Sequence, residues 1–66
     1  MTFLKTLREI RQDKGITQLQ LAQKLGVGES TVRGWERVYE PSFVLLCKIA
    51  EVFGVTVGQL LGVEEY

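Results

Sequence analysis

Residues 17–37 read TQLQLAQKLGVGESTVRGWER, and this segment carries the strongest fold signals of the chain. Thr17 and Gln20 have the spacing of a capping box, in which each side chain bonds the backbone amide of the other residue at the start of a helix. Gly26 suits the left-handed position that closes a short helix. These signals predict a helix over residues 17–25, whose inner face is formed by Leu21, Ala22 and Leu25.

A second helix follows after a tight, glycine-containing connection, and we expect it over residues 29–37. The pattern places Val32, Trp35 and Glu36 on one side of it. Gly34 lies in its interior, where glycine costs about 1 kcal/mol relative to alanine, so a close approach to another surface would explain it. Two short helices joined by such a turn form a helix-turn-helix unit.

Three more helices are expected, one before this unit and two after it. The first covers residues 3–14, with Thr2 as its N-cap and an apolar stripe made of Leu4, Leu7 and Ile10. Pro41 disfavours helix at the residue before it, so the fourth helix begins at Ser42 and runs to residue 53. Its expected apolar face comprises Phe43, Leu46, Ile49, Ala50 and Phe53. Thr56 caps a last short helix over residues 57–61.

A chain of 66 residues has room for a single core. The predicted fold class is therefore all-α, a compact five-helix bundle that forms one domain over residues 1–66.

The charge is balanced overall but unevenly distributed. A net charge of zero argues against a domain that binds polyanions unspecifically. Residues 1–37 hold seven basic and four acidic residues, a net charge of +3, whereas residues 38–66 hold one basic and four acidic residues, a net charge of −3. A local surface that faces phosphates therefore stays open as an interpretation.

Several classes of protein are disfavoured by the composition. The chain has no histidine and one cysteine, Cys47, so we expect no metal site, no catalytic dyad and no cofactor, and we set an enzyme aside. Cys47 is expected to be a small buried hydrophobe. The single cysteine favours a reducing cytoplasm. No apolar run approaches the roughly 20 residues that span a bilayer, so we expect no membrane association.

A series of short matches, in order along the chain, resembles the phage-repressor-like (Xre) helix-turn-helix family. The matching residues are Thr17-Gln18, Leu21-Ala22, Leu25-Gly26-Val27, Ser30-Thr31-Val32, Trp35-Glu36, Pro41-Ser42 and Phe53-Gly54-Val55. The resemblance covers roughly residues 4–61 and implies a lambda-repressor-like DNA-binding domain whose third helix lies in the major groove.

The resemblance implies that the outward residues of the third helix lie nearest the base edges. These are Glu29, Ser30, Arg33 and Gly34. Arg33 can bond guanine O6 and N7 together, Ser30 can bond several bases, and Glu29 could accept a bond from cytosine N4. Gly34 would let the backbone approach a base methyl group. Trp35, by contrast, is expected in the core, where burial of its indole stabilises more than stacking.

Residues at the start of the second helix are implied to hold a phosphate. Thr17 and Gln18 match that place, and Arg37, Lys14 and Lys5 are weaker candidates because surface basic residues are usually only solvated. The resemblance also implies a structural ion pair between Arg11 and Glu36 that fastens the first helix to the third.

The sequence departs from the family pattern after the third helix. Glu36 and Pro41 are five positions apart, which shortens the loop, and Val38 stands where members usually carry glycine. Gly28 replaces the customary serine N-cap, which either weakens the start of the third helix by about a few tenths of a kcal/mol or is offset by Ser30.

The predicted function is sequence-specific binding of double-stranded DNA by a transcriptional regulator, with repressor favoured over activator. Large apolar residues are expected on the surface, either as scattered hydrophobes or as a partner surface: Leu19, Val38, Tyr39, Phe43, Val44, Val63 and Tyr66. We favour a homodimer, because regulators of this kind commonly bind two half-sites. The alternative is a protein-interaction module on the same fold, such as an antitoxin or anti-regulator, since a fold does not by itself determine function.

Overall fold

A computed structural model describes the backbone of residues 3–66 and the side chains of residues 6–66. The expected N-cap at Thr2 and the side chains of Leu4 and Lys5 lie outside this part of the chain. The helices follow the order α1 Phe3–Asp13, α2 Gln18–Leu25, α3 Glu29–Trp35, α4 Phe43–Phe53 and α5 Val57–Leu61. Residues 3–66 form no strand, so the predicted all-α class is confirmed.

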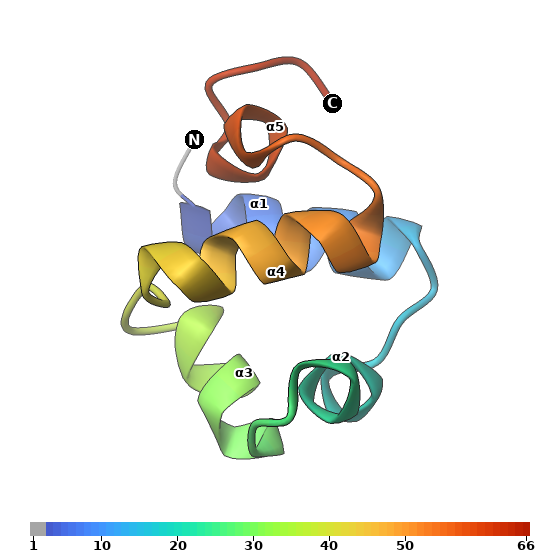
Figure 1. Cartoon of the computed structure of the whole chain (residues 1–66), viewed down its shortest axis with the longest axis vertical. Coiled ribbons are helices and arrows are strands. Elements are labelled where there is room, and N and C mark those ends of the chain that lie inside the picture. The colour runs from blue at the N-terminus through green and yellow to red at the C-terminus, as the bar shows by residue number, and fades with distance from the viewer. Residues whose placement is uncertain (1–2) are drawn as a thin grey trace.

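The helices form two groups, which lie toward opposite ends of the longest axis of the molecule (Figure 1). This axis measures 28 Å. At one end α5 packs against α1 and α4, and toward the other end α2 packs against α3 and α4 (Figure 1). The C-terminus lies beside α5, so the tail is far from α3 (Figure 1). Within residues 3–66, no helix is long and apolar enough to cross a membrane.

Local side-chain to backbone bonds start three of the helices where the sequence predicts them. Thr17 and Gln20 form the capping box of α2, with Gln20 N–H donating to Thr17 Oγ1 at 3.0 Å and Thr17 N–H donating to Gln20 Oε1 at 2.8 Å. Ser42 caps α4, and Thr56 caps α5. Gly26 ends α2 with a φ of 73°, a left-handed conformation that favours glycine.

The third helix is shorter than expected, and the prediction of helix over residues 36–37 is wrong. Three successive amides, those of Arg37, Val38 and Tyr39, all donate to the Gly34 carbonyl, at 3.1, 2.8 and 3.1 Å. A continuing helix would give each amide a different acceptor. The chain therefore turns sharply after Trp35, and Arg37 lies in the turn.

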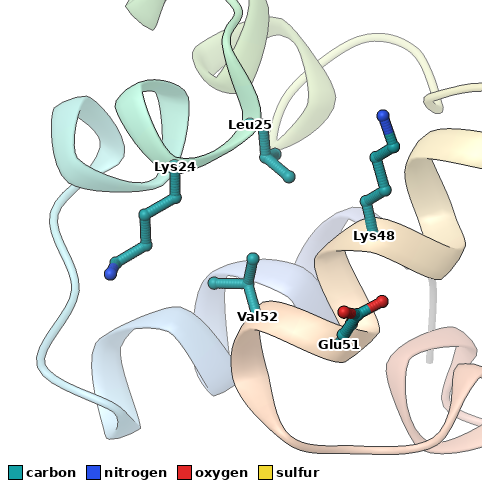
Figure 2. A pocket seen from close by; sticks show the side chains of 5 residues that line it. All are labelled: Lys24, Leu25, Lys48, Glu51 and Val52. Carbon is teal, nitrogen blue, oxygen red and sulfur yellow. The ribbon is translucent and has the colours of Figure 1, made fainter.

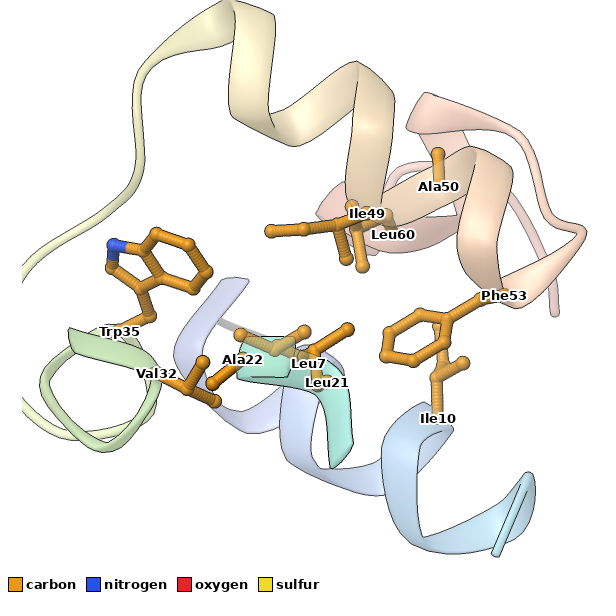
Figure 3. Close-up of a cluster of buried hydrophobic side chains, with 10 residues drawn as sticks. All are labelled: Leu7, Ile10, Leu21, Ala22, Val32, Trp35, Ile49, Ala50, Phe53 and Leu60. Carbon is orange, nitrogen blue, oxygen red and sulfur yellow. The ribbon is translucent and has the colours of Figure 1, made fainter. Parts of the chain in front are cut away.

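A single cluster of ten apolar side chains forms the core of the described part (Figure 3). Its members are Leu7, Ile10, Leu21, Ala22, Val32, Trp35, Ile49, Ala50, Phe53 and Leu60. Trp35 is buried as expected. Phe43 was expected both on the apolar face of the fourth helix and among the exposed apolar residues, and the second expectation holds, since Phe43 is 70% exposed. The first turn of α4 precedes the core, and packing begins only at Leu45. Cys47, expected to be buried, is only half-buried.

Candidate nucleic-acid interface

The carboxylate of Glu36 lies at the point where α1 meets α3. Glu36 is the C-cap residue of α3, and its side chain is fully buried. Arg11 of α1 donates from Nε to Glu36 Oε2 at 2.6 Å and from Nη2 to Oε1 at 3.1 Å. A third guanidinium nitrogen, Nη1, donates to the Ile16 carbonyl at 2.8 Å. This bidentate ion pair has the geometry of the strongest charge-assisted hydrogen bonds.

Two further side chains reach the same carboxylate. Gln18, the first residue of α2, donates from Nε2 to Glu36 Oε1 at 3.2 Å. Arg8 places Nε 3.7 Å from that oxygen while its side chain stays 52% exposed. Neither contact was expected from the sequence. Glu36 therefore ties α1, α2 and α3 together, and this arrangement holds α2 and α3 in a defined relative orientation.

The outward side of α3 is exposed along its first two turns. Val32 and Trp35 face the core, whereas Glu29, Ser30 and Arg33 are exposed on the other side. Arg33 Nη2 lies 3.7 Å from Glu29 Oε1, one helical turn away, with the two side chains 48% and 45% exposed. The residues expected to face base edges are thus together and accessible, except at Gly34.

Gly34 is covered by a side chain of the same protein. A Cβ atom placed on Gly34 would lie 2.6 Å from the Cε1, Cζ and hydroxyl oxygen of Tyr39. The close approach expected at this glycine is therefore made by the ring of Tyr39. The glycine inside the expected helix signalled a close approach, but which surface approached it depended on the turn after Trp35.

A shallow hollow lies at the C-terminal end of this surface. Its volume is about 330 Å³, and it is lined by Ser30, Arg33, Gly34, Arg37 and Val38. Two of these residues are arginines with exposed side chains. The hollow therefore offers concave, positively charged surface beside the outward side of α3, which is suited to an anionic backbone.

The residues expected to hold phosphates lie on three different segments of the chain. Thr17 is exposed at the start of α2, next to Gln18, and Arg37 lies in the turn after α3. Lys14 is different, because its ammonium lies 5.6 Å from the centre of the Tyr66 ring in the C-terminal tail. Tyr66 in turn donates its hydroxyl to Asp13, and this bond raises the pKa of Tyr66.

A second hollow, between α2 and α4, has a volume of about 430 Å³ (Figure 2). Leu25 and Val52 point toward each other across it, whereas the charged ends of Lys24, Lys48 and Glu51 point away (Figure 2). A small-molecule site needs a few polar groups that converge on the ligand. This hollow does not show that convergence.

The family comparison agrees with the geometry of α2 and α3. A family model described as helix-turn-helix matches residues 7–60. The chain belongs to the helix-turn-helix family. The resemblance to phage-repressor-like (Xre) helix-turn-helix domains, with the lambda-repressor-like fold that it implied, is thereby confirmed.

Curated relatives of this helix-turn-helix domain come from bacteria and archaea. The HTH-type transcriptional regulator ImmR of Bacillus subtilis is 36% identical over 66 residues, which cover 98% of this chain and 52% of ImmR. The HTH-type transcriptional activator BcrR of Enterococcus faecalis is 37% identical over 67 residues, covering 98% of this chain and 32% of BcrR. An uncharacterised HTH-type transcriptional regulator of Archaeoglobus fulgidus is 42% identical over 55 residues, covering 82% of this chain and 79% of that protein. The chain therefore spans about half the length of ImmR and a third of BcrR.

Proposed function

We propose that this helix-turn-helix domain binds double-stranded DNA sequence-specifically and regulates transcription in the cytoplasm. The single observation that carries the proposal is the outward side of α3, where Glu29, Ser30 and Arg33 are exposed together on a helix that Glu36 fastens to its neighbours. An α-helix with its side chains is about 10–12 Å across, so it fits a major groove about 12 Å wide. The names of the relatives, all transcriptional regulators, support the same function.

The roles follow from the chemistry of each side chain. Arg33 would bond guanine O6 and N7, and Ser30 would bond a donor or an acceptor at a base edge. Glu29 would accept a bond from cytosine N4 or hold Arg33 in place. Thr17, Gln18 and Arg37 would bond phosphates and set the register of the domain on the duplex. The Thr17 hydroxyl accepts the capping bond and still has a proton to donate. Lys14 is a weaker candidate because it lies over Tyr66.

A repressor is favoured over an activator, because a bound domain can block a promoter by occupancy alone. We also propose a homodimer. One small domain makes few contacts, and two-fold dimers bind half-sites about one turn of DNA apart, roughly 34 Å. Exposed apolar side chains at Val38, Phe43 and Val44, here called the 38–44 patch, are the proposed contact between the two copies.

The proposed function is tested by selecting bound duplexes from a random pool and titrating the selected duplex in salt. Binding that neutralises several phosphates weakens steeply as salt rises. A protein-interaction module on the same fold, such as an antitoxin, is the second candidate, favoured by the neutral net charge and the exposed apolar residues. That candidate predicts no enriched duplex and a partner contact that barely responds to salt.

Two arginines distinguish base reading from phosphate contact. Arg33→Ala should relax the preference at one base position and weaken the selected duplex by about 1–3 kcal/mol, because a two-pronged contact to guanine is lost. Arg37→Ala, its matched control in the turn, should weaken all duplexes alike and reduce the salt slope by about one. Repeating the selection with each variant checks both results, and identical behaviour of the two variants contradicts the assigned roles.

A further inference from the structure

The side chain of Tyr39 stands on the surface that the proposed function presents to DNA. The turn after α3 brings its amide back to the Gly34 carbonyl, at 3.1 Å, and its ring occupies the space where Gly34 would carry a Cβ atom. Tyr39 nevertheless stays 49% exposed. The hydroxyl and the adjoining Cε1–Cζ edge of the ring therefore lie over Gly34, on the outward side of α3, and about half of the side chain stays accessible.

The position of Gly34 on the helix decides what the ring can meet. Gly34 lies four residues, about one helical turn, after Ser30, so it shares the outward side of α3 with that residue, although it is only half-buried there. A duplex that approaches this exposed side closely meets the Tyr39 ring at its C-terminal end. Tyr39 must then contact the duplex or be displaced from Gly34.

We propose that Tyr39 is a further DNA-contacting residue, which bonds the sugar-phosphate backbone with its hydroxyl at the edge of the major groove. In helix-turn-helix docking the N-terminal residues of the recognition helix contact base edges, so a group at its C-terminal end lies toward the wall of the groove. Tyrosine hydroxyls bond phosphate oxygens. Arg37 lines the adjacent hollow and would add positive charge beside the same phosphates. This inference rests on the proposed function.

The test compares Tyr39→Phe and Tyr39→Ala with the wild-type chain on the duplex recovered by selection and on a mismatched duplex of equal length. Tyr39→Phe removes one hydrogen bond and should weaken both duplexes by the same factor, about 3- to 10-fold. Tyr39→Ala should weaken both more. Thermal unfolding of each variant shows whether the fold is kept, which the exposure of the ring leads us to expect.

Gly34→Ala displaces the ring without deleting it. The added methyl group meets only the far end of a flexible side chain, so the domain should fold with an unchanged or higher melting temperature. Binding should fall in the wild-type background and be unaffected by Gly34→Ala when Tyr39→Ala is already present. A loss of the same size in both backgrounds would mean that the methyl group itself meets the DNA, which overturns the role of Tyr39.

The outcomes separate this inference from the function on which it rests. If the wild-type chain binds its selected duplex and both Tyr39 variants bind equally well, the inference alone is wrong. A change of base preference in Tyr39→Phe contradicts the assignment to the backbone. If the wild-type chain enriches no duplex, the proposed function is wrong and the inference fails with it.

Discussion

Glu36 carries a charge into the interior, where a carboxylate is tolerated only when donors surround it. Arg11 supplies two of those donors and Gln18 a third. The carboxylate satisfies them in turn, so removing it would leave a mostly buried guanidinium without its partner. At the scale of single residues, the orientation of α3 therefore depends on one acidic side chain.

Glu36→Ala should destabilise the domain by about 3–5 kcal/mol, the usual consequence of breaking a buried ion pair. Denaturant unfolding, followed by circular dichroism, measures this loss. Glu29→Ala is the matched control, because Glu29 pairs with Arg33 on the surface and should change stability by only about 0.5 kcal/mol or less. A Glu36→Ala variant with the denaturation midpoint of the wild type would contradict the structural role of the Arg11–Glu36 pair.

At the scale of elements, α3 is seven residues long and begins without a side-chain cap. Helices much shorter than about 12 residues are marginal in isolation, so its stability comes from packing against neighbouring helices. Val32 and Trp35 supply that packing, and α2 is its main neighbour. A capping side chain in place of Gly28 should therefore stabilise the start of α3.

Gly28→Ser should stabilise the domain by about 0.5–1 kcal/mol, by adding a cap and reducing the entropy of the unfolded chain. Gly28 has a φ of −78°, which serine adopts freely, and an added Cβ atom would meet only ordinary contacts, 3.7 Å from the Ser30 hydroxyl oxygen. Differential scanning calorimetry should show a melting temperature higher by roughly 2–8 °C.

Gly26→Ser provides the matched control two residues earlier. Its φ of 73° is unfavourable for a side chain, although nothing lies within 4 Å of an added Cβ atom. Stability should therefore fall by about 1–2 kcal/mol through backbone strain alone. Equal effects of the two serine substitutions would show that backbone conformation at these glycines does not control stability.

At the scale of the whole molecule, size and exposed apolar surface bear on assembly. The domain measures 28 Å along its longest axis. In the proposed dimer, two copies would contact each other across a two-fold axis with their α3 helices one turn of DNA, roughly 34 Å, apart. In the 38–44 patch, Val38 and Phe43 are 76% and 70% exposed, which gives a second copy apolar surface to cover.

Sedimentation velocity should show that the sedimentation coefficient of the wild-type chain rises with concentration. Phe43→Ser should abolish this rise without lowering the melting temperature, because Phe43 lies outside the core. Val63→Ser, which removes an equally exposed side chain from the tail, should leave it unchanged. A wild-type chain that stays monomeric at high concentration, with and without its selected duplex, would exclude the proposed dimer.

The amino-acid pattern was enough to predict the five helices, the caps at Thr17, Ser42 and Thr56, and most of the core. Each of these depends on interactions within a few residues, either between a side chain and a nearby amide or through the helical repeat of apolar positions. The spacing of Glu36 from Val32 also predicted that it lies on the inner side of the third helix, and its pairing with Arg11 was implied by the family resemblance.

The arrangement of side chains around α3 could not be predicted from such patterns and required the folded chain. The bond from Gln18 to Glu36 depends on how α2 and α3 pack against each other in space. The early end of α3 and the ring of Tyr39 over Gly34 involve residues three to five positions apart, but they depend on a sharp turn that follows no helical or capping pattern. Such contacts leave no periodic signal in the sequence. The sharp turn at residues 36–39 therefore gave Gly34 a neighbour from its own chain, where local pattern alone indicated a free surface.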